Sequence, residues 1–371
     1  MLYRPFGKTG VKVSRLGFGA MRLPMQGPEG AETVCEDEAV ALLRRAFELG
    51  VNYVDSGYTY CKSQSEMVIG KALAGRRDKV QVATKFPTWL SNSTGDYRRC
   101  LDEQLRRLKV EYIDFYHFHG LDRNRYQDQV LRYKLLDEAH KAKEQGLIKH
   151  LSFSFHDKPE VLKQLVDEGW AESVLCQYNL ITPDNAKAIS YARRKGLGVA
   201  VMGPVGGGRL GGSFPVLQGF IPETAKSMAE LALRFVWSHP DVDLALSGMS
   251  SLKQLEENVA TAERDAKLSA QEQQRLRDAM NKAAQLSELY CTGCDYCAPC
   301  PKGVKISKVL SIYITHRVYG LAQHARKSYR KLPAKYRSEQ CVGCGECEKK
   351  CPQHLPIRTH LKAAAAELGE G

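Results

Sequence analysis

The stretch CTGCDYCAPCP, residues 291–301, decides how the end of this chain folds, and the stretch CVGCGECEKKCP, residues 341–352, repeats its pattern. In each stretch two residues separate the first three cysteines, and the last cysteine precedes a proline. The eight cysteines are Cys291, Cys294, Cys297, Cys300, Cys341, Cys344, Cys347 and Cys351. Three thiolates spaced in this way wrap around one iron–sulfur cube. The pattern therefore predicts two 4Fe-4S clusters.

The ligands of the two clusters are expected to cross between the stretches. Cys351 would complete the first cluster and Cys300 the second, as in two-cluster ferredoxins. Only two residues separate Cys297 from Cys300, where three are usual before the Cys-Pro, so the sequence leaves the crossed assignment of ligands open. Structural zinc would not explain the paired Cys-Pro ends, and disulfides would need an oxidising compartment. Helices are predicted at residues 304–319 and 322–336, so the module resembles the helical two-cluster ferredoxins attached to redox enzymes.

The composition is that of an ordinary globular protein, with 43% hydrophobic and 26% charged residues in a chain of 371. This length allows one large domain and one small domain. No apolar run is long enough to span a membrane, and the first residues lack the apolar core of a signal peptide. We therefore expect a cytoplasmic protein without membrane contact. The remaining cysteines are scattered singly, as reduced thiols would be: Cys35, Cys61, Cys100 and Cys176.

The net charge of +12 is concentrated at the end of the chain. From residue 301 onward there are 14 Lys and Arg against 5 Glu, whereas the first 300 residues carry 40 against 37. Two oxidised clusters with their eight thiolates would together contribute a net charge of roughly −4. The basic excess either offsets this charge or attracts an acidic electron carrier such as a flavodoxin or an acidic ferredoxin. No nucleic-acid-binding module is recognised, so nucleic acid is not expected as a partner.

Residues 1 to about 265 alternate short apolar runs with amphipathic stretches. Strands are predicted at residues 16–20, 51–55, 80–85, 112–119, 148–154, 173–177, 198–202 and 242–247. Helices are predicted at residues 37–48, 96–108, 131–144, 159–168, 183–194, 223–237 and 252–263. This alternation predicts a (β/α)8 barrel. Residues 2–14 are expected to form a hairpin that plugs one end, and residues 269–289 a last helix before the cysteines.

Reactive side chains stand at the ends of three successive predicted strands. Asp55 ends the second strand, Lys85 the third and His119 the fourth, and Tyr60 follows Asp55 by five residues. Each has an ordinary alternative, since such residues also cap helices, pack in turns or face water. Parallel strands of a barrel end at one mouth, so the four together indicate an active site.

Several segments together resemble the aldo-keto reductase family, in the variant fused to a two-cluster ferredoxin domain. They are residues 3–10, 16–19, 54–60, 65–66, 83–85, 113–119, 177–179 and 248–258. The resemblance implies a TIM barrel at residues 1–285, followed by a small helical ferredoxin-like domain at residues 286–371.

The resemblance also implies transfer of hydride between a nicotinamide and a small carbonyl or alcohol substrate. Tyr60 would supply the proton, and the Lys85 ammonium would lower the pKa of this otherwise sluggish phenol. Asp55 would hold Lys85, and His119 would orient the carbonyl oxygen. Cys61 replaces the glycine that usually follows the tyrosine.

The cofactor would be NADPH or NADH. The positions that the resemblance assigns to it are Gly19, Ala20, Met21, Ser154, Gln177, Met202, Gly203, Pro204, Gly206, Ser250, Gln254, Glu257 and Asn258. Phe155 replaces the asparagine that usually follows Ser154, and Met202 replaces a stacking aromatic residue. Gln254 stands where many relatives have the arginine that binds the 2′-phosphate, so the preference between the two nucleotides stays open.

Three functions are compatible with these features. The leading hypothesis is an NAD(P)H-dependent oxidoreductase whose clusters exchange single electrons with a partner. In the second, cluster electrons reduce a substrate in the barrel without nicotinamide, because Phe155 and Met202 no longer favour that ring. The third is a non-catalytic redox sensor or adaptor. The substrate pocket is expected to include Tyr58, Phe86, Trp89 and residues around 214–220.

Overall fold

The computed structural model describes residues 1–28, 31–212, 215–220, 223–265, 267–282, 289, 291–317 and 322–369. The chain forms two compact units. The first consists of Met1–Asn179, Pro183–Pro204 and Ala232–Leu268, and the second of Leu180–Thr182, Val205–Leu231 and Ser269–Gly371. The boundary predicted between residues 285 and 286 lies outside the described residues and stays a prediction. In the described part of the chain, no helix has both the length and the apolar character needed to cross a membrane.

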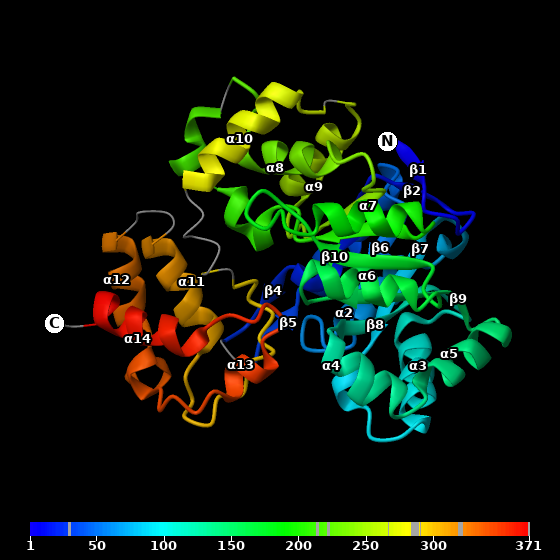
Figure 1. The fold of residues 1–371 in the computed structure, drawn as a ribbon, viewed down its shortest axis with the longest axis horizontal. Helices are drawn as coiled ribbons and strands as arrows, with labels where there is room; N and C mark the ends of the chain where they lie inside the picture. Colours follow the sequence, from blue (N-terminus) through cyan, green and yellow to red (C-terminus); the bar gives the residue numbers. More distant parts are fainter. Residues whose placement is uncertain are drawn as a thin grey trace. The chain divides into compact units, whose positions relative to one another are not determined.

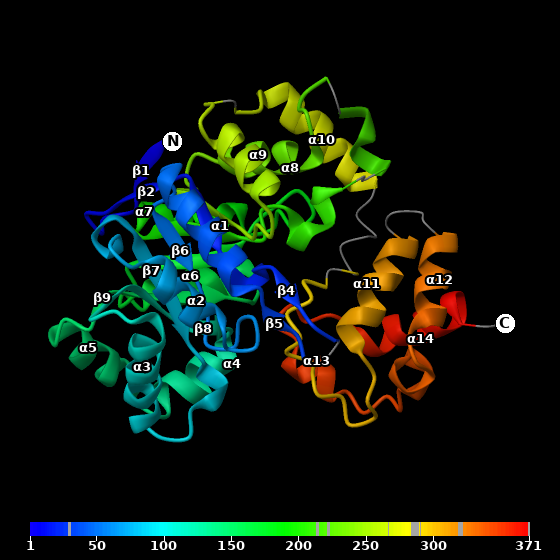
Figure 2. The ribbon, with the colours of Figure 1, turned by 180° about the vertical axis from the view of Figure 1, so that it is seen from behind.

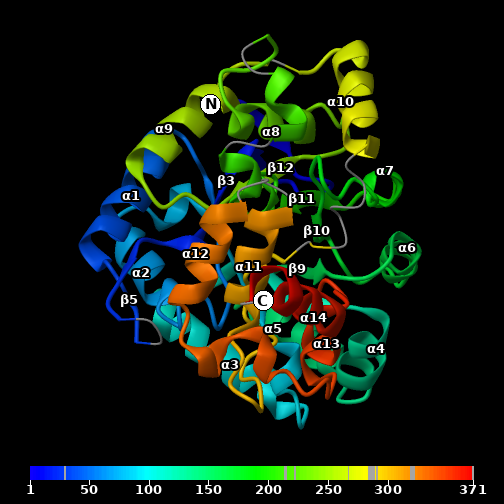
Figure 3. The same ribbon diagram turned by 90° about the vertical axis from the view of Figure 1, so that its left-hand side faces the viewer.

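Eight parallel strands close into a barrel in the first unit, which confirms the predicted fold. In order around the barrel they are β3 (Leu16–Gly19), β6 (Tyr53–Asp55), β7 (Gln81–Phe86), β8 (Ile113–Leu121), β9 (Ile148–Phe155), β10 (Ser173–Gln177), β11 (Gly198–Met202) and β12 (Leu244–Ser247). Figure 3 shows part of this order, from β3 through β12 and β11 to β10 and β9. All nine residues of β8 are buried, as expected for a strand covered on both faces.

Helices alternate with the strands and cover the outside of the barrel (Figure 2). They are α1 (Glu36–Glu48), α2 (Ser65–Ala72), α3 (Gly95–Leu108), α5 (Leu135–Glu144), α6 (Pro159–Asp167), α7 (Ala186–Arg194), α8 (Met228–Trp237) and α9 (Leu252–Ala262). In α1 the buried residues Ala39, Leu42, Leu43 and Ala46 recur at helical spacing. Burial of this apolar stripe holds the helix against the strands.

The predicted helices are wrong at two places in this region. The helices named from the sequence do not include one between the second and third strands, where the structure has α2. This helix is only eight residues long and buries the polar residues Ser65 and Glu66, so it has no clear apolar period. Helix α8 begins at Met228 rather than at residue 223, because Ser227 caps it by accepting the Glu230 N–H at 3.1 Å.

A hairpin of β1 (Tyr3–Pro5) and β2 (Lys12–Ser14) closes the end of the barrel where the strands begin. It carries Phe6, whose ring lies edge-on to Phe115 at 5.1 Å and to Tyr53 at 5.9 Å between centroids. A Cβ at Gly7 would lie 2.2 Å from the Gly198 nitrogen, so only glycine fits there. The hairpin therefore leaves the opposite end, where the strands finish, to the functional residues.

We expect Phe6→Ala to lower the free energy of unfolding of the first unit by about 3–5 kcal/mol, because it empties the centre of the plug. The change is measured as a urea midpoint by tryptophan fluorescence, since Trp89, Trp170 and Trp237 all belong to this unit. The control is Leu2→Ala, at a residue that is 37% exposed, with a cost of about 0.5 kcal/mol or less. Equal losses for the two variants would contradict the role of Phe6.

Helices dominate the end of the second unit (Figure 1). They are α10 (Ala270–Lys282), α11 (Ile306–Arg317), α12 (Ala322–Lys331), α13 (Glu346–Lys350) and α14 (Ile357–Leu368). Helices α11 and α12 lie side by side, and α14 packs against both. Helix α12 ends five residues earlier than predicted, because Pro333 has no N–H to continue it. This helical layer holds the two cysteine stretches.

Candidate active site and cysteine centres

The mouth of the barrel contains a buried ion pair. Asp55 is the last residue of β6, and Lys85 lies near the end of β7, the neighbouring strand. The Lys85 Nζ atom lies 2.6 Å from Asp55 Oδ2 and also donates to the backbone oxygen of Ser56. Lys85 is 1% exposed and Asp55 4%. Two acceptors therefore fix the ammonium group in a place that water does not reach.

Tyr60 and His119 lie beside this pair. The Lys85 Nζ atom is 4.6 Å from the centre of the Tyr60 ring, and the Tyr60 and His119 rings meet edge to face at 5.9 Å between centroids. A Cβ at Gly57 would lie 2.9 Å from Tyr60 Cε1, so the absence of a side chain there lets the phenol approach. The structure thus brings together the four residues that the sequence singles out: Asp55, Tyr60, Lys85 and His119.

Burial controls the charges of this cluster. It lowers the pKa of Lys85 below 10.5, an effect that Asp55 opposes. It also raises the pKa of Asp55, an effect that Lys85 opposes. Burial, followed by the charge of Lys85, holds the pKa of His119 well below 6.5. The His119 imidazole is therefore neutral at pH 7 and is able to donate one hydrogen bond to a carbonyl oxygen.

A second histidine of this cluster, His117, was not predicted from the sequence. It lies two residues before His119, on the same face of β8, and its Nε2 atom is 3.9 Å from Asp55 Oδ1. Burial holds its pKa well below 6.5 as well, so it adds no positive charge next to Lys85 at pH 7. The two-residue spacing is the signal that would have placed His117 beside the site.

The loop after Tyr60 has an unusual backbone. Cys61, Lys62 and Ser63 follow one another in the left-handed region, with φ of 49°, 55° and 65°. Each such residue costs roughly 1–2 kcal/mol. The Cys61 thiol points to the backbone oxygens of Ala20 and Met21 at 3.6 and 3.5 Å. The strained loop thus ties Tyr60 to the segment that follows β3.

A buried polar network supports the outer side of β7. The Glu66 carboxylate accepts hydrogen bonds from Thr84 at 2.6 Å, from Gln104, and from Arg107 at 3.2 Å. Gln104 also donates to the backbone oxygen of Lys85 at 3.1 Å. Burial raises the pKa of Glu66, and these three donors oppose the shift. The network fixes the strand from which Lys85 projects.

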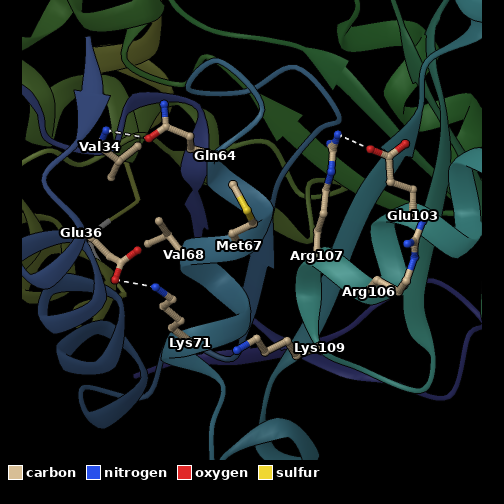
Figure 4. Close-up of a pocket in the computed structure, with 10 residues that line it drawn as sticks. All are labelled: Val34, Glu36, Gln64, Met67, Val68, Lys71, Glu103, Arg106, Arg107 and Lys109. Carbon is tan, nitrogen blue, oxygen red and sulfur yellow. Dashed lines mark hydrogen bonds and ion pairs between the residues drawn. The ribbon is translucent and has the colours of Figure 1, made fainter.

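Arg107 links this network to the surface. Figure 4 shows Arg107 in a groove that Gln64, Met67 and Lys71 also line. There it pairs with Glu103 at 2.5 Å, and its guanidinium lies 4.4 Å above the centre of the Tyr58 ring. The groove is built by α2 and α3 on the outside of the barrel. It is therefore separate from the mouth where the strands end.

The residues expected in the substrate pocket have different surroundings. The Trp89 ring lies 4.9 Å from that of His119, so it does border the site. Tyr58 instead donates to Glu103 at 2.7 Å, towards α3. Phe86 is fully buried against Tyr97 and Phe118, away from the mouth. Residue 214 lies outside the described residues.

The positions expected for the nicotinamide occupy neighbouring strand ends. The register pairs Gln177 with Met202, and Leu175 with Ser154, at the end of the barrel that also holds Asp55. The Ser154 hydroxyl oxygen accepts the Gly120 N–H at 2.7 Å and keeps its own hydrogen to donate. The hydroxyl of Ser154 and the amide of Gln177 offer the donors and acceptors that a carboxamide requires.

Phe155 does not face this mouth. It is 1% exposed, and its ring lies edge-on to Phe153, which packs against Trp170. These contacts belong to the side of β9 that carries the helices, whereas Ser154 points to the other side. The replacement of asparagine by Phe155 therefore adds an outer-layer residue and leaves the mouth unfilled.

The positions expected for the adenosine half lie after β12. The Gln254 side chain accepts from the Ser250 N–H at 2.9 Å, and Asn258 donates to Ser247 at 3.1 Å. Glu257 lies 3.9 Å from Lys253. A Cβ at Gly19 would lie 3.5 Å from the Gly248 nitrogen, so the segment of Gly19, Ala20 and Met21 runs close to this loop.

The glycine-rich stretch belongs partly to each unit. Gly203, whose oxygen accepts from Asn179 at 2.8 Å, and Pro204 belong to the first. Gly206 belongs to the second, where it begins a run of three left-handed glycines. The N–H of Gly208 is used inside this turn, since it donates to the Val205 oxygen at 3.0 Å.

The structure joins Cys351 to the first cysteine stretch. A pocket in the second unit is lined by Cys291, Cys294, Cys297 and Cys351. The Cys351 thiol interacts electrostatically with each of the other three. Four thiols around one pocket are the ligand set of a cubane cluster, and the presence of Cys351 among them agrees with the crossed pattern.

The loop that contains Cys300 runs beside the approach to Cys341. The Gly303 N–H donates to the Cys300 oxygen, and the Lys305 N–H donates to the Tyr336 oxygen at 3.0 Å. From Tyr336 a short 3-10 turn, Ser338–Gln340, leads to Cys341. This arrangement brings Cys300 towards the second stretch, where the crossed pattern expects it.

We expect Cys351→Ala to remove the same cluster as Cys294→Ala, because both thiols line one pocket. The iron content of anaerobically reconstituted protein would fall from about eight to about four per chain, and both variants would keep the same electron paramagnetic resonance spectrum after reduction. Cys300→Ala serves as the matched control. It would remove the second cluster and leave the spectrum of the first. If Cys351→Ala instead resembled Cys344→Ala, the ligands would not cross.

Comparison with known proteins agrees with both units. Residues 15–281 match the aldo/keto reductase family, and residues 290–355 match the 4Fe-4S dicluster domain. The chain is 30% identical to L-galactose dehydrogenase of Arabidopsis thaliana over 283 residues, which cover 69% of this chain and 86% of the plant protein. The aldo-keto reductase AKR11C1 from Bacillus halodurans, in its holo form, is 27% identical with a TM-score of 0.64, over 75% of this chain and 96% of that one.

Proposed function

The chain belongs to the aldo/keto reductase family of oxidoreductases and carries a 4Fe-4S dicluster domain, and on this basis we propose that it transfers hydride between NAD(P)H and a small carbonyl or alcohol substrate. The observation that carries the proposal is the cluster of Lys85, Asp55, Tyr60 and His119, with Lys85 2.6 Å from Asp55 and 4.6 Å from the Tyr60 ring. The name of the plant relative, a galactose dehydrogenase, agrees with such a substrate.

The protein's own groups supply the proton and the orientation. A carbonyl that accepts hydride develops negative charge on oxygen, and the Tyr60 hydroxyl would donate its proton there. The charge of Lys85 would stabilise the phenolate that remains, while Asp55 keeps Lys85 in place. The neutral His119 would donate a hydrogen bond that polarises the same oxygen.

The nicotinamide would supply or accept the hydride when bound. Ser154 and Gln177 would hold its carboxamide, because their hydroxyl and amide match its donor and acceptor. Gly19, Ala20 and Met21 would lie along the cofactor, and Ser250, Gln254, Glu257 and Asn258 would border the adenosine half. The alternative, in which cluster electrons reduce a substrate without nicotinamide, was based on Phe155 and Met202. Phe155 no longer favours it, since this residue packs on the helix side of β9.

We expect Tyr60→Phe to lower kcat for carbonyl reduction by about 10²–10⁴, the usual contribution of a positioned general acid. Since the phenyl ring preserves the packing, the affinity for NADPH or NADH should stay within about twofold. The decline of nicotinamide absorbance with a panel of aldehydes and ketones measures kcat, and quenching of protein fluorescence measures the affinity. Unchanged turnover in the variant would remove Tyr60 from the chemistry.

The rate of carbonyl reduction should decline as pH rises. We expect this decline to begin at a lower pH than the titration of an ordinary lysine would give. Burial lowers the pKa of Lys85 below 10.5, so the ammonium that supports proton donation is lost earlier as pH rises. The pH profile of kcat/KM, recorded anaerobically, measures this limb. Lys85→Arg is the control, because its guanidinium stays charged over this range and its residual activity should lack the same limb. A limb that persists in Lys85→Arg would assign the titration to another group.

A further inference from the structure

The segment that joins the two cysteine stretches is strongly basic. Residues 301–340 contain ten Lys and Arg but a single acid, Glu339. Eight of the ten bases are exposed in the structure: Lys302, Lys308, Arg317, Arg326, Lys327, Arg330, Lys331 and Lys335. The segment thus has a net charge of +9 and joins Cys300 to Cys341.

The carboxylates of this region are committed elsewhere. Glu367 pairs with His316 and Arg317, Glu346 with Lys349, and Glu348 with Arg358. Glu339 accepts a hydrogen bond from Tyr329. Among the described residues, no carboxylate forms an ion pair with Lys302, Lys305 or Lys335. Their charges are therefore available to an external partner.

Two of these lysines lie around the half-buried Tyr336 ring, and Lys302 precedes Lys305 by three residues. We call this group the Tyr336 cluster: Lys302, Lys305, Lys335 and Tyr336. The ammonium groups of Lys305 and Lys335 lie 5.3 and 5.0 Å from the centre of the Tyr336 ring. Lys302 follows Cys300 by two residues, and Lys335 precedes Cys341 by six. The Tyr336 cluster thus stands between two ligands expected for the second iron–sulfur centre.

That centre is expected to include the most exposed of the eight cysteines, Cys344, and Val342 in the same stretch is 62% exposed. Cys347 and Cys351 are buried, and the other five cysteines are half-buried. Because electron tunnelling weakens steeply with distance, a carrier protein has to approach through the exposed centre. Val342 directly follows Cys341, so an exposed apolar side chain stands next to a ligand expected for this centre.

We propose that the Tyr336 cluster, together with Val342, is the docking surface for a small acidic protein that carries one electron at a time. The partner's carboxylates pair with Lys302, Lys305 and Lys335, and its redox group faces the centre expected to be held by Cys300, Cys341, Cys344 and Cys347. One electron leaves the reduced carrier, which is oxidised by one step, and one electron enters the oxidised cluster; no bond forms or breaks. The inference rests on the hypothesis, drawn from the sequence, that the two clusters exchange single electrons with a partner.

The test is the rate at which a reduced acidic flavodoxin or ferredoxin bleaches the cluster absorbance of the full-length, cluster-loaded protein in stopped flow. Lys302→Glu combined with Lys335→Glu should lower the second-order rate constant at least about tenfold at low salt and flatten its dependence on ionic strength. The matched control is Lys141→Glu combined with Lys187→Glu on helices α5 and α7, which changes the net charge equally and should alter the rate by less than about twofold.

Equal slowing in both double variants would overturn the proposal, because it would show an effect of total charge alone. Faster reduction by a basic carrier than by an acidic one would also overturn it. Iron content and visible spectra, measured first, confirm that each variant holds both clusters. Carbonyl reduction with NADPH or NADH is assayed in the same samples, so that loss of the barrel activity and loss of docking are recorded separately.

Discussion

The ion pair of Lys85 and Asp55 is the interaction on which the active site depends. Removing an ammonium and a carboxylate from water costs several kcal/mol for each ion. The 2.6 Å contact and the additional acceptor at Ser56 offset part of this cost. The pair cannot relax towards solvent, because both residues sit at the ends of adjacent buried strands. The chain thus keeps a positive charge under the Tyr60 ring, where stability alone would favour an apolar side chain.

Charged side chains are placed differently in the two units. In the barrel, buried charged side chains pair with other polar groups, as Glu66 does with its three donors. In the cysteine-rich unit, the basic groups are displayed on the surface around thiolates whose clusters carry negative charge. The first arrangement suits chemistry that has to exclude water. The second suits contact with a charged partner that binds and leaves quickly.

The barrel was predictable because its strands and helices alternate regularly in the sequence. The four residues at its mouth were predictable because they follow from the ends of those strands. Apolar runs mark the strands, and reactive side chains at their ends meet at one mouth. Helix α2 escaped this reasoning, since its buried residues are largely polar and small. The direction of Phe155 also escaped it, because a shift of one residue along a strand exchanges the two faces. The left-handed run from Cys61 to Ser63 has no sequence signal, since none of the three is glycine.

The crossing of Cys351 to the first cysteine stretch has a consequence for how the protein matures in the cell. Each stretch has four cysteines, but if the ligands cross as the pocket with Cys351 indicates, a metal centre closes only after the two stretches have come together. Cofactor insertion and the acquisition of tertiary structure are then a single event in this unit. A newly made chain that lacks its last thirty residues would then hold three of the four thiols of the first centre and two of the four of the second, so neither set of ligands would be complete.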